Sequence, residues 1–158
     1  MTLSLIRRTR RRAALLAALA GLASPALAEP QCRPLMPIGG GGDPTVQKRI
    51  SAARLVGRTN WNTDFAVTDT FRSYRLTIQS VSTGRGTFPL AVFLRFTDGS
   101  NLQVVNDSLT LEPQQSRRLG PFLAVPDKRT SVVNVRVGSS SMPGSTGFSY
   151  RVSVEGCR

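Results

Sequence analysis

Carboxylates are the side chains in this sequence that could carry out acid–base chemistry, because the chain contains no histidine. The lack of histidine excludes Ser-His-Asp and Cys-His catalysis and every histidine-based metal site. Glycoside hydrolases instead use two carboxyl groups about 5–10 Å apart. Asp64 and Asp69 flank one predicted strand, and Asp98 and Asp107 flank another. Turn and strand-end positions explain all four, so we assign no catalytic residue. A carboxylate-based hydrolase of cell-wall or extracellular glycan is kept as the alternative function.

Calcium binding is a second chemistry that needs only oxygen ligands. Asp98, Asn101, Asn106 and Asp107 lie at predicted loop ends, where such ions are often held. The sequence has no EF-hand pattern and no Asp-rich repeat, and turn formation accounts for each of these residues. We therefore predict neither a metal site nor a cofactor.

Arginines at alternating strand positions are the third candidate. Arg75, Arg95, Arg136 and Arg151 each fall opposite in parity to the apolar residues of their strands, as does Phe93. Arginine binds sulfate, phosphate and carboxylate through two parallel hydrogen bonds. The prediction is that at least three of these arginines share one sheet face and form a shallow surface for an anionic glycan or lipid. The competing interpretation is that they are ordinary solvated strand positions.

Residues 1–28 have the pattern of a secretory signal peptide. Five arginines precede an apolar run from Ala13 to Ala23, and Ala26-Leu27-Ala28 fits a cleavage site. We expect cleavage after Ala28, export by the Sec route rather than the twin-arginine route, and a periplasmic or extracellular protein with no transmembrane segment. Cleavage reduces the basic residues from 21 to 16 against nine acidic ones, so the net charge falls from +12 to +7. Nucleic acid is not an expected partner of such an exported chain.

The two cysteines of the chain, Cys32 and Cys157, lie near opposite ends of the expected mature protein. In an oxidising compartment an isolated pair most simply forms a disulfide. Their Cα atoms should then lie within about 7 Å of each other. This places the N-terminal arm beside the last strand.

The elements that must position these residues begin after a Pro- and Gly-rich arm, residues 29–42. Asp43-Pro44 is typical of a helix start, and Val46, Ile50 and Ala53 would lie on one helical face, ending at Gly57. The sequence therefore predicts a short helix there, with an extended edge segment over 50–56 as the alternative. Trp61 is expected to close one end of the core.

The remainder of the single domain, 43–158, alternates between apolar and polar residues in about eight short strands. Turns are expected at Asp98-Gly99 and at residues 106–108. The pattern predicts an all-β antiparallel sandwich of the jelly-roll or immunoglobulin-like Greek-key type. The residues expected between the two sheets are Tyr74, Leu76, Ile78, Leu90, Val92, Leu94, Phe96, Val133, Val135, Val137, Tyr150, Val152 and Val154.

The last segment, GFSYRVSVEGC, resembles the final strand of small secreted bacterial sandwich modules such as pre-peptidase C-terminal domains. The likeness covers one strand and implies no function. Together, the sequence predicts an exported, non-enzymatic binding, adhesion or structural module of the bacterial cell envelope. Its expected partner is an anionic envelope polymer or another envelope protein.

Overall fold

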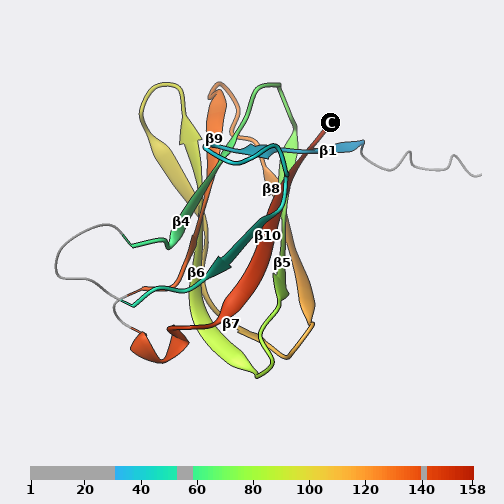
Figure 1. Ribbon diagram of the computed structural model, residues 1–158. Coiled ribbons are helices and arrows are strands. Elements are labelled where there is room, and N and C mark those ends of the chain that lie inside the picture. Colours follow the sequence, from blue (N-terminus) through green and yellow to red (C-terminus); the bar gives the residue numbers. More distant parts are fainter. Residues whose placement is uncertain (1–30, 53–58, 140–141) are drawn as a thin grey trace, which may run out of the picture.

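The computed structural model describes residues 31–52, 59–139 and 142–158, so the predicted signal peptide lies outside the described residues. The described chain forms two antiparallel sheets packed face to face (Figure 1). The predicted all-β antiparallel sandwich is therefore correct. Its strands are β1 (Cys32–Pro34), β2 (Met36–Pro37), β3 (Val46–Arg49), β4 (Asn62–Ala66), β5 (Ser73–Ser80), β6 (Gly86–Phe96), β7 (Asn101–Leu111), β8 (Ser116–Leu123), β9 (Thr130–Val137) and β10 (Ser149–Cys157).

Each sheet contains five strands, and the chain crosses repeatedly between the sheets. In sheet A, β10 is the central strand: β5 and then β8 lie on one side of it, and β1 and β3 pair with it on the other. Sheet B has the order β2-β4-β9-β6-β7. The Pro- and Gly-rich segment thus supplies β1 to sheet A and β2 to sheet B.

The core lies between the sheets, and strand parity predicted its members. All thirteen residues expected there are buried, with at most 5% of any one exposed. Phe65, Phe88 and Leu111 are fully covered as well. Trp61 is also buried, and its Nε1 donates a hydrogen bond to the carbonyl oxygen of Ser51 (3.0 Å). The expectation that it closes one end of the core is confirmed.

The helix predicted after Asp43 is wrong, because Val46–Arg49 forms strand β3, paired with β10. Val46 and Ile50 are four residues apart, a spacing that suits one face of a strand as well as one face of a helix. The backbone of this segment bonds to β10 instead of to itself. Asp43 accepts a hydrogen bond from the amide of Thr45 (2.7 Å), so it forms a local turn and not a helix cap. Residues 53–58 lie outside the described residues.

The turn predicted at residues 106–108 is also wrong, although the one at Asp98-Gly99 is correct. Strand β7 continues from Asn101 to Leu111 because β6 provides an equally long partner. A bulge in β7 opposite Val92 and Phe93 shifts the register by one residue, because Val104 is left without a partner in the pairing. Polar residues at 106–108 are tolerated because their strand is at the sheet edge.

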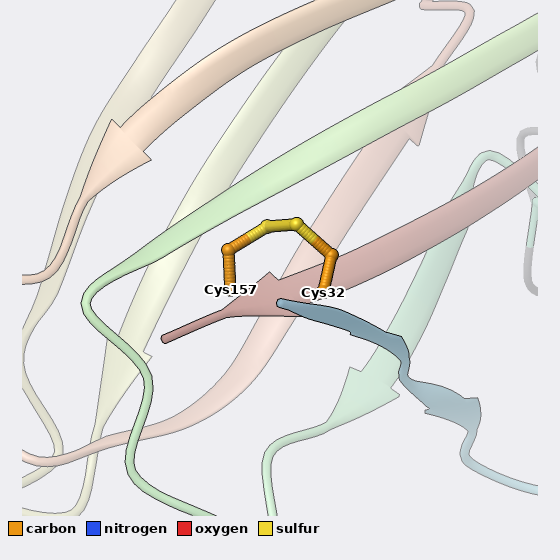
Figure 2. The surroundings of a disulfide bond; sticks show 2 residues. All are labelled: Cys32 and Cys157. Carbon is orange, nitrogen blue, oxygen red and sulfur yellow. A yellow bond between two sulfur atoms is a disulfide. The ribbon is translucent and has the colours of Figure 1, made fainter. Parts of the chain in front are cut away.

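The predicted disulfide is confirmed. Cys32 and Cys157 are bonded, with their Cα atoms 4.0 Å apart (Figure 2). The two residues are directly opposite each other in the pairing of β1 with β10. The N-terminal arm therefore lies beside the last strand, as expected. No helix in the described part of the chain is long and apolar enough to cross a membrane.

Candidate functional site

The outer face of sheet B carries a concentration of amide side chains around one aromatic ring. Residues directly opposite each other on antiparallel strands point to the same face. The register therefore aligns Asp64, Asn134, Phe93 and Gln103 in one row across β4, β9, β6 and β7. The neighbouring rows place Asn62, Arg136, Ala91 and Asn106 on one side, and Ala66, Val132, Arg95 and Asn101 on the other.

Two hollows lie on this face and share Phe93 and Arg136. One, of about 220 Å³, is lined by Asn62, Phe93, Arg95, Asn101, Asn134 and Arg136. The other, of about 360 Å³, extends past Ala91 to Gln103, Asn106 and Ser139. Ala91 lies between Arg136 and Asn106 in the register, and its short side chain leaves space between two long ones. We call the two hollows together the sheet B groove.

A polar network fixes one wall of the groove. Asn134 is buried, with 1% of it exposed, although it is on the outer face of the sheet. Its Nδ2 donates a hydrogen bond to Oδ1 of Asp64 (2.6 Å), and Nη1 of Arg95 lies 3.7 Å from Oδ2 of the same carboxylate. One carboxylate thus accepts a hydrogen bond from an amide and forms an ion pair with a guanidinium at the groove.

The second arginine of the groove is held by an aromatic ring. The guanidinium carbon of Arg136 lies 5.8 Å from the ring centroid of Trp61, within the range of a cation–π contact. Trp61 is itself fixed by the core and by its bond to Ser51. Two buried side chains, Trp61 and Asn134, therefore help to position the groove.

The prediction that at least three of four arginines share one face is wrong. Arg75 on β5 and Arg151 on β10 belong to sheet A, whereas Arg95 on β6 and Arg136 on β9 belong to sheet B. Strand parity determined that all four point outward, but the crossovers of the chain divide them between opposite outer faces. Phe93, Arg95 and Arg136 do lie together in one hollow.

The carboxylates considered for hydrolysis are engaged in separate places. Asp64 contacts Asn134 and Arg95 on the outer face of sheet B. Asp69, in the loop after β4, forms ion pairs with Arg33 and Arg158. The structure does not bring these two carboxylates into one polar network.

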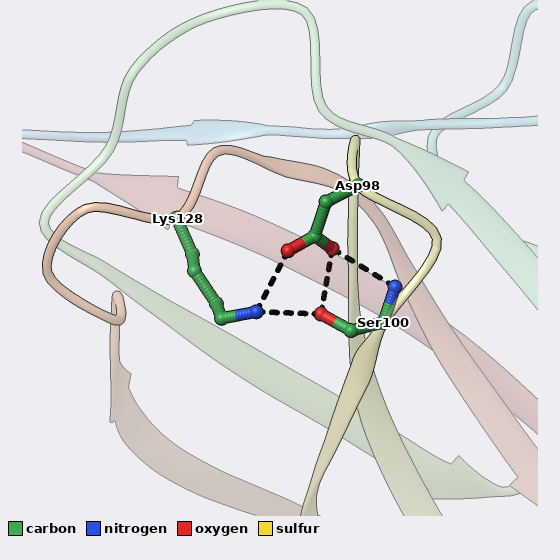
Figure 3. A network of polar contacts seen from close by, with 3 residues as sticks. All are labelled: Asp98, Ser100 and Lys128. Carbon is green, nitrogen blue, oxygen red and sulfur yellow. Dashed lines mark hydrogen bonds and ion pairs between the residues drawn. The ribbon is translucent and has the colours of Figure 1, made fainter.

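Of the residues considered for calcium, Asp98 serves the β6–β7 hairpin instead. Asp98 accepts hydrogen bonds from Nζ of Lys128 (2.7 Å), from the hydroxyl of Ser100 (2.6 Å) and from the amide of Ser100 (2.9 Å) (Figure 3). These donors, Lys128 first, hold the pKa of Asp98 well below its usual range. Among the described residues, no group of three or more Cys, Asp or Glu is placed to hold a metal ion.

Lys48, next to the groove, is held by backbone carbonyls. Its Nζ donates to the oxygens of Asn62 (2.7 Å) and Asn60 (3.2 Å). Burial lowers the pKa of Lys48, and the nearby charge of Asp64 partly opposes that effect. The contacts tie β3 of sheet A to the strand of sheet B that begins at Asn62.

Sequence reasoning missed the amide character of this face. Asn101 and Asn106 were considered only as calcium ligands, and Asn62 and Gln103 were not considered as site residues. Asn62 suits a turn as well as the start of a strand, and the mistaken turn at residues 106–108 hid the register of β7. Only the order of the strands places these amides beside Phe93.

The chain matches no known protein family model. A search of curated proteins likewise finds no match. Among solved structures, it is similar to the C-terminal family 22 carbohydrate-binding module of a Clostridium thermocellum protein, with 10% sequence identity and a TM-score of 0.38. The similarity covers 84% of this chain and 87% of that one. At this TM-score the likeness assigns neither a ligand nor site residues to the chain.

Proposed function

We propose that this protein is a non-enzymatic binding module that holds a glycan chain in the sheet B groove. The observation that carries the proposal is the gathering of amides and two arginines around Phe93 across four neighbouring strands. Amides offer donors and an acceptor, and guanidinium groups offer a fork of donors, which together match adjacent sugar hydroxyls. An outward aromatic ring offers an apolar surface for the face of a sugar ring.

The groove is suited to binding and not to turnover. The carboxylate beside it, Asp64, is occupied by Asn134 and Arg95. An open hollow on a sheet face also leaves a bound chain exposed to solvent along one side, which suits recognition of a section of a longer polymer. This supports a role in binding or adhesion.

We propose further that the protein is exported and acts at the bacterial cell envelope. The leader-like residues 1–28 and the Cys32–Cys157 disulfide both support this, because structural disulfides persist in oxidising compartments. A glycan of the envelope or of the surroundings would then be accessible to the groove.

The test is binding of the chain from Glu29 onward to cellohexaose, xylohexaose and chitohexaose, followed by calorimetry on any oligosaccharide that binds. Phe93→Ala and Gln103→Ala should each weaken binding about tenfold, a loss of ~1.4 kcal/mol. Gln31→Ala removes an exposed amide that precedes β1 and lines neither hollow of the groove, so it serves as the matched control, with affinity unchanged.

Two outcomes contradict the proposal. In one, binding survives Phe93→Ala and Gln103→Ala in folded protein. In the other, the wild-type chain releases new reducing ends from these oligosaccharides and Asp64→Asn abolishes the release, which would establish the hydrolase alternative.

A further inference from the structure

The outer face of sheet A carries four arginines. Two of them, Arg75 and Arg151, belong to the set predicted from the sequence, and two do not. Arg75 and Arg151 are joined there by Arg49 of β3 and Arg118 of β8. Arg49 is opposite Ser149, Arg151 is opposite Gln79, and Arg118 is opposite Thr77. We call these four residues the sheet A arginine stripe.

Arg49, Arg151 and Arg118 lie on a diagonal from β3 across β10 to β8, and Arg75 lies on β5 in the next row. Along β10 the rows of the stripe extend from Ser149 to Glu155, about 20 Å at the usual rise of a strand. Across β3, β10, β5 and β8 it spans three strand spacings, about 15 Å. The four arginines are therefore spread over an elongated area, which matches a chain bearing repeated charges better than it matches one small anion.

The stripe arginines take no part in the ion pairs of the described chain. The ion pairs of the described residues involve Arg33, Arg85, Arg95, Lys128 and Arg158, but none of the four stripe arginines. The one acidic residue in the aligned rows is Glu155, opposite Arg75. The stripe thus presents an excess of three positive charges on one face.

Two of the guanidinium groups are held in place by hydrogen bonds that their Nε atoms donate. Nε of Arg151 donates to Oε1 of Gln47 (3.0 Å), and Nε of Arg49 donates to the carbonyl oxygen of Gly147 (2.9 Å). These bonds use Nε, so the terminal nitrogens remain for paired contacts with an anionic group. Because these side chains are already ordered before a ligand binds, less conformational entropy is lost on binding.

The residues between the arginines are hydroxyls and amides: Ser116, Ser149, Ser153, Thr77 and Gln79. Such groups hydrogen-bond to sugar hydroxyls. The rows from Ser149 to Glu155 carry no large apolar or aromatic side chain, and the exposed Leu123 in the next row, opposite Ser73, is a single apolar residue, fewer than an anchor in a lipid interface needs. A second copy of the same positive face would be repelled.

We infer that the sheet A arginine stripe binds a linear polyanionic polysaccharide, one whose repeating units carry sulfate or carboxylate groups. This second site is independent of the sheet B groove. The protein would then hold two polymers on opposite faces of one sandwich.

The experiment measures binding of a size-fractionated heparin octasaccharide, with a neutral dextran of similar length as the comparison probe. Arg118→Gln combined with Arg151→Gln should weaken heparin binding about tenfold or more. Arg85→Gln combined with Arg129→Gln removes the same charge from loops outside the stripe, and should change affinity less than about twofold. Binding should also fall as salt rises above about 0.1 M, where charges are screened beyond about 10 Å.

Thermal unfolding of both double variants verifies that they are folded. If the Arg118→Gln, Arg151→Gln variant does not fold, the single variant Arg118→Lys replaces it. Equal losses in the two double variants would overturn the inference, since net charge alone would then explain binding. Attachment to vesicles of phosphatidylglycerol without binding of heparin would overturn it too. Oligosaccharide binding in the sheet B groove should be unaffected by the stripe variants, so failure of one site is distinguishable from failure of the other.

Discussion

At the scale of single residues, two glycines in this sandwich, Gly86 and Gly156, lie where an aromatic ring occupies the space of a side chain. A Cβ atom built on Gly86 would lie 2.1 Å from Cδ2 of Phe148, and one on Gly156 would lie 2.5 Å from the ring of Phe71. The ring of Phe148 also packs against Phe88, with centroids 4.9 Å apart. The small residues are thus part of the aromatic packing that closes the core.

Gly86→Ala should therefore destabilise the protein by about 1–3 kcal/mol, because Phe148 must leave its position against Phe88. Gly84→Ala is the matched control, since nothing lies within 4 Å of the Cβ it would add. Urea unfolding of the two variants measures the difference. Equal midpoints for Gly86→Ala and the wild type would show that the ring does not occupy this position in solution.

At the scale of elements, loops on different strands are joined by side-chain contacts at the end of the sandwich. The β6–β7 hairpin contributes Asp98 and Ser100, and the β8–β9 loop contributes Lys128 (Figure 3). Nζ of Lys128 also lies 5.2 Å from the ring centroid of Phe96. The loop is thereby held to the hairpin by one cation.

The lowered pKa of Asp98 makes this connection dependent on pH. A carboxyl group whose pKa is lower in the folded state stabilises the protein above its unfolded pKa, about 3.9, and loses that contribution as the pH falls towards the folded pKa. Asp98→Asn should be less stable than the wild type at pH 7, and the difference should shrink below about pH 4. Urea unfolding at several pH values measures this, with Asp127→Asn as a control for loss of one negative charge. A difference that stays constant down to pH 2 would contradict the role of Lys128.

At the scale of the whole molecule, a disulfide joins the two ends of the described chain. The disulfide between Cys32 and Cys157 joins β1 to the end of β10, the central strand of sheet A (Figure 2). It closes nearly all of the described chain into one loop. Constraining so long a loop in the unfolded state stabilises the fold.

If the protein is exported and oxidised, the chain recovered from its host should have the intact mass of residues 29–158. A thiol assay on the denatured protein should detect no free thiol. The variant Cys32→Ser with Cys157→Ser should be less stable by about 2–5 kcal/mol in urea unfolding, with its strand content unchanged. A recovered chain that retains residues 1–28, or that carries two free thiols, would contradict export with an oxidised pair.

Much of the fold was readable from the sequence because a strand alternates its side chains with period two. Residues such as Leu76, Val92 and Val152 could be placed in the core, and Arg75 and Phe93 on an outer face, from parity alone. The cysteine pair was equally readable, because only two cysteines exist. The segment at Val46 was misread since a spacing of four residues suits both a helix face and a strand face.

Strand order could not be predicted from the sequence, because the pairing of strands far apart in the chain does not appear in the local alternation of apolar and polar residues. Whether Arg95 and Arg151 share a face depends on which sheet each strand joins, and that is decided by packing of the entire chain. The same packing placed Asn62 and Gln103 around Phe93, and brought Arg49 and Arg118 into line with Arg151. In most strands the sequence alone determined which way the side chains point. Tertiary structure decided which side chains become neighbours, because neighbours across a sheet come from strands far apart in the chain.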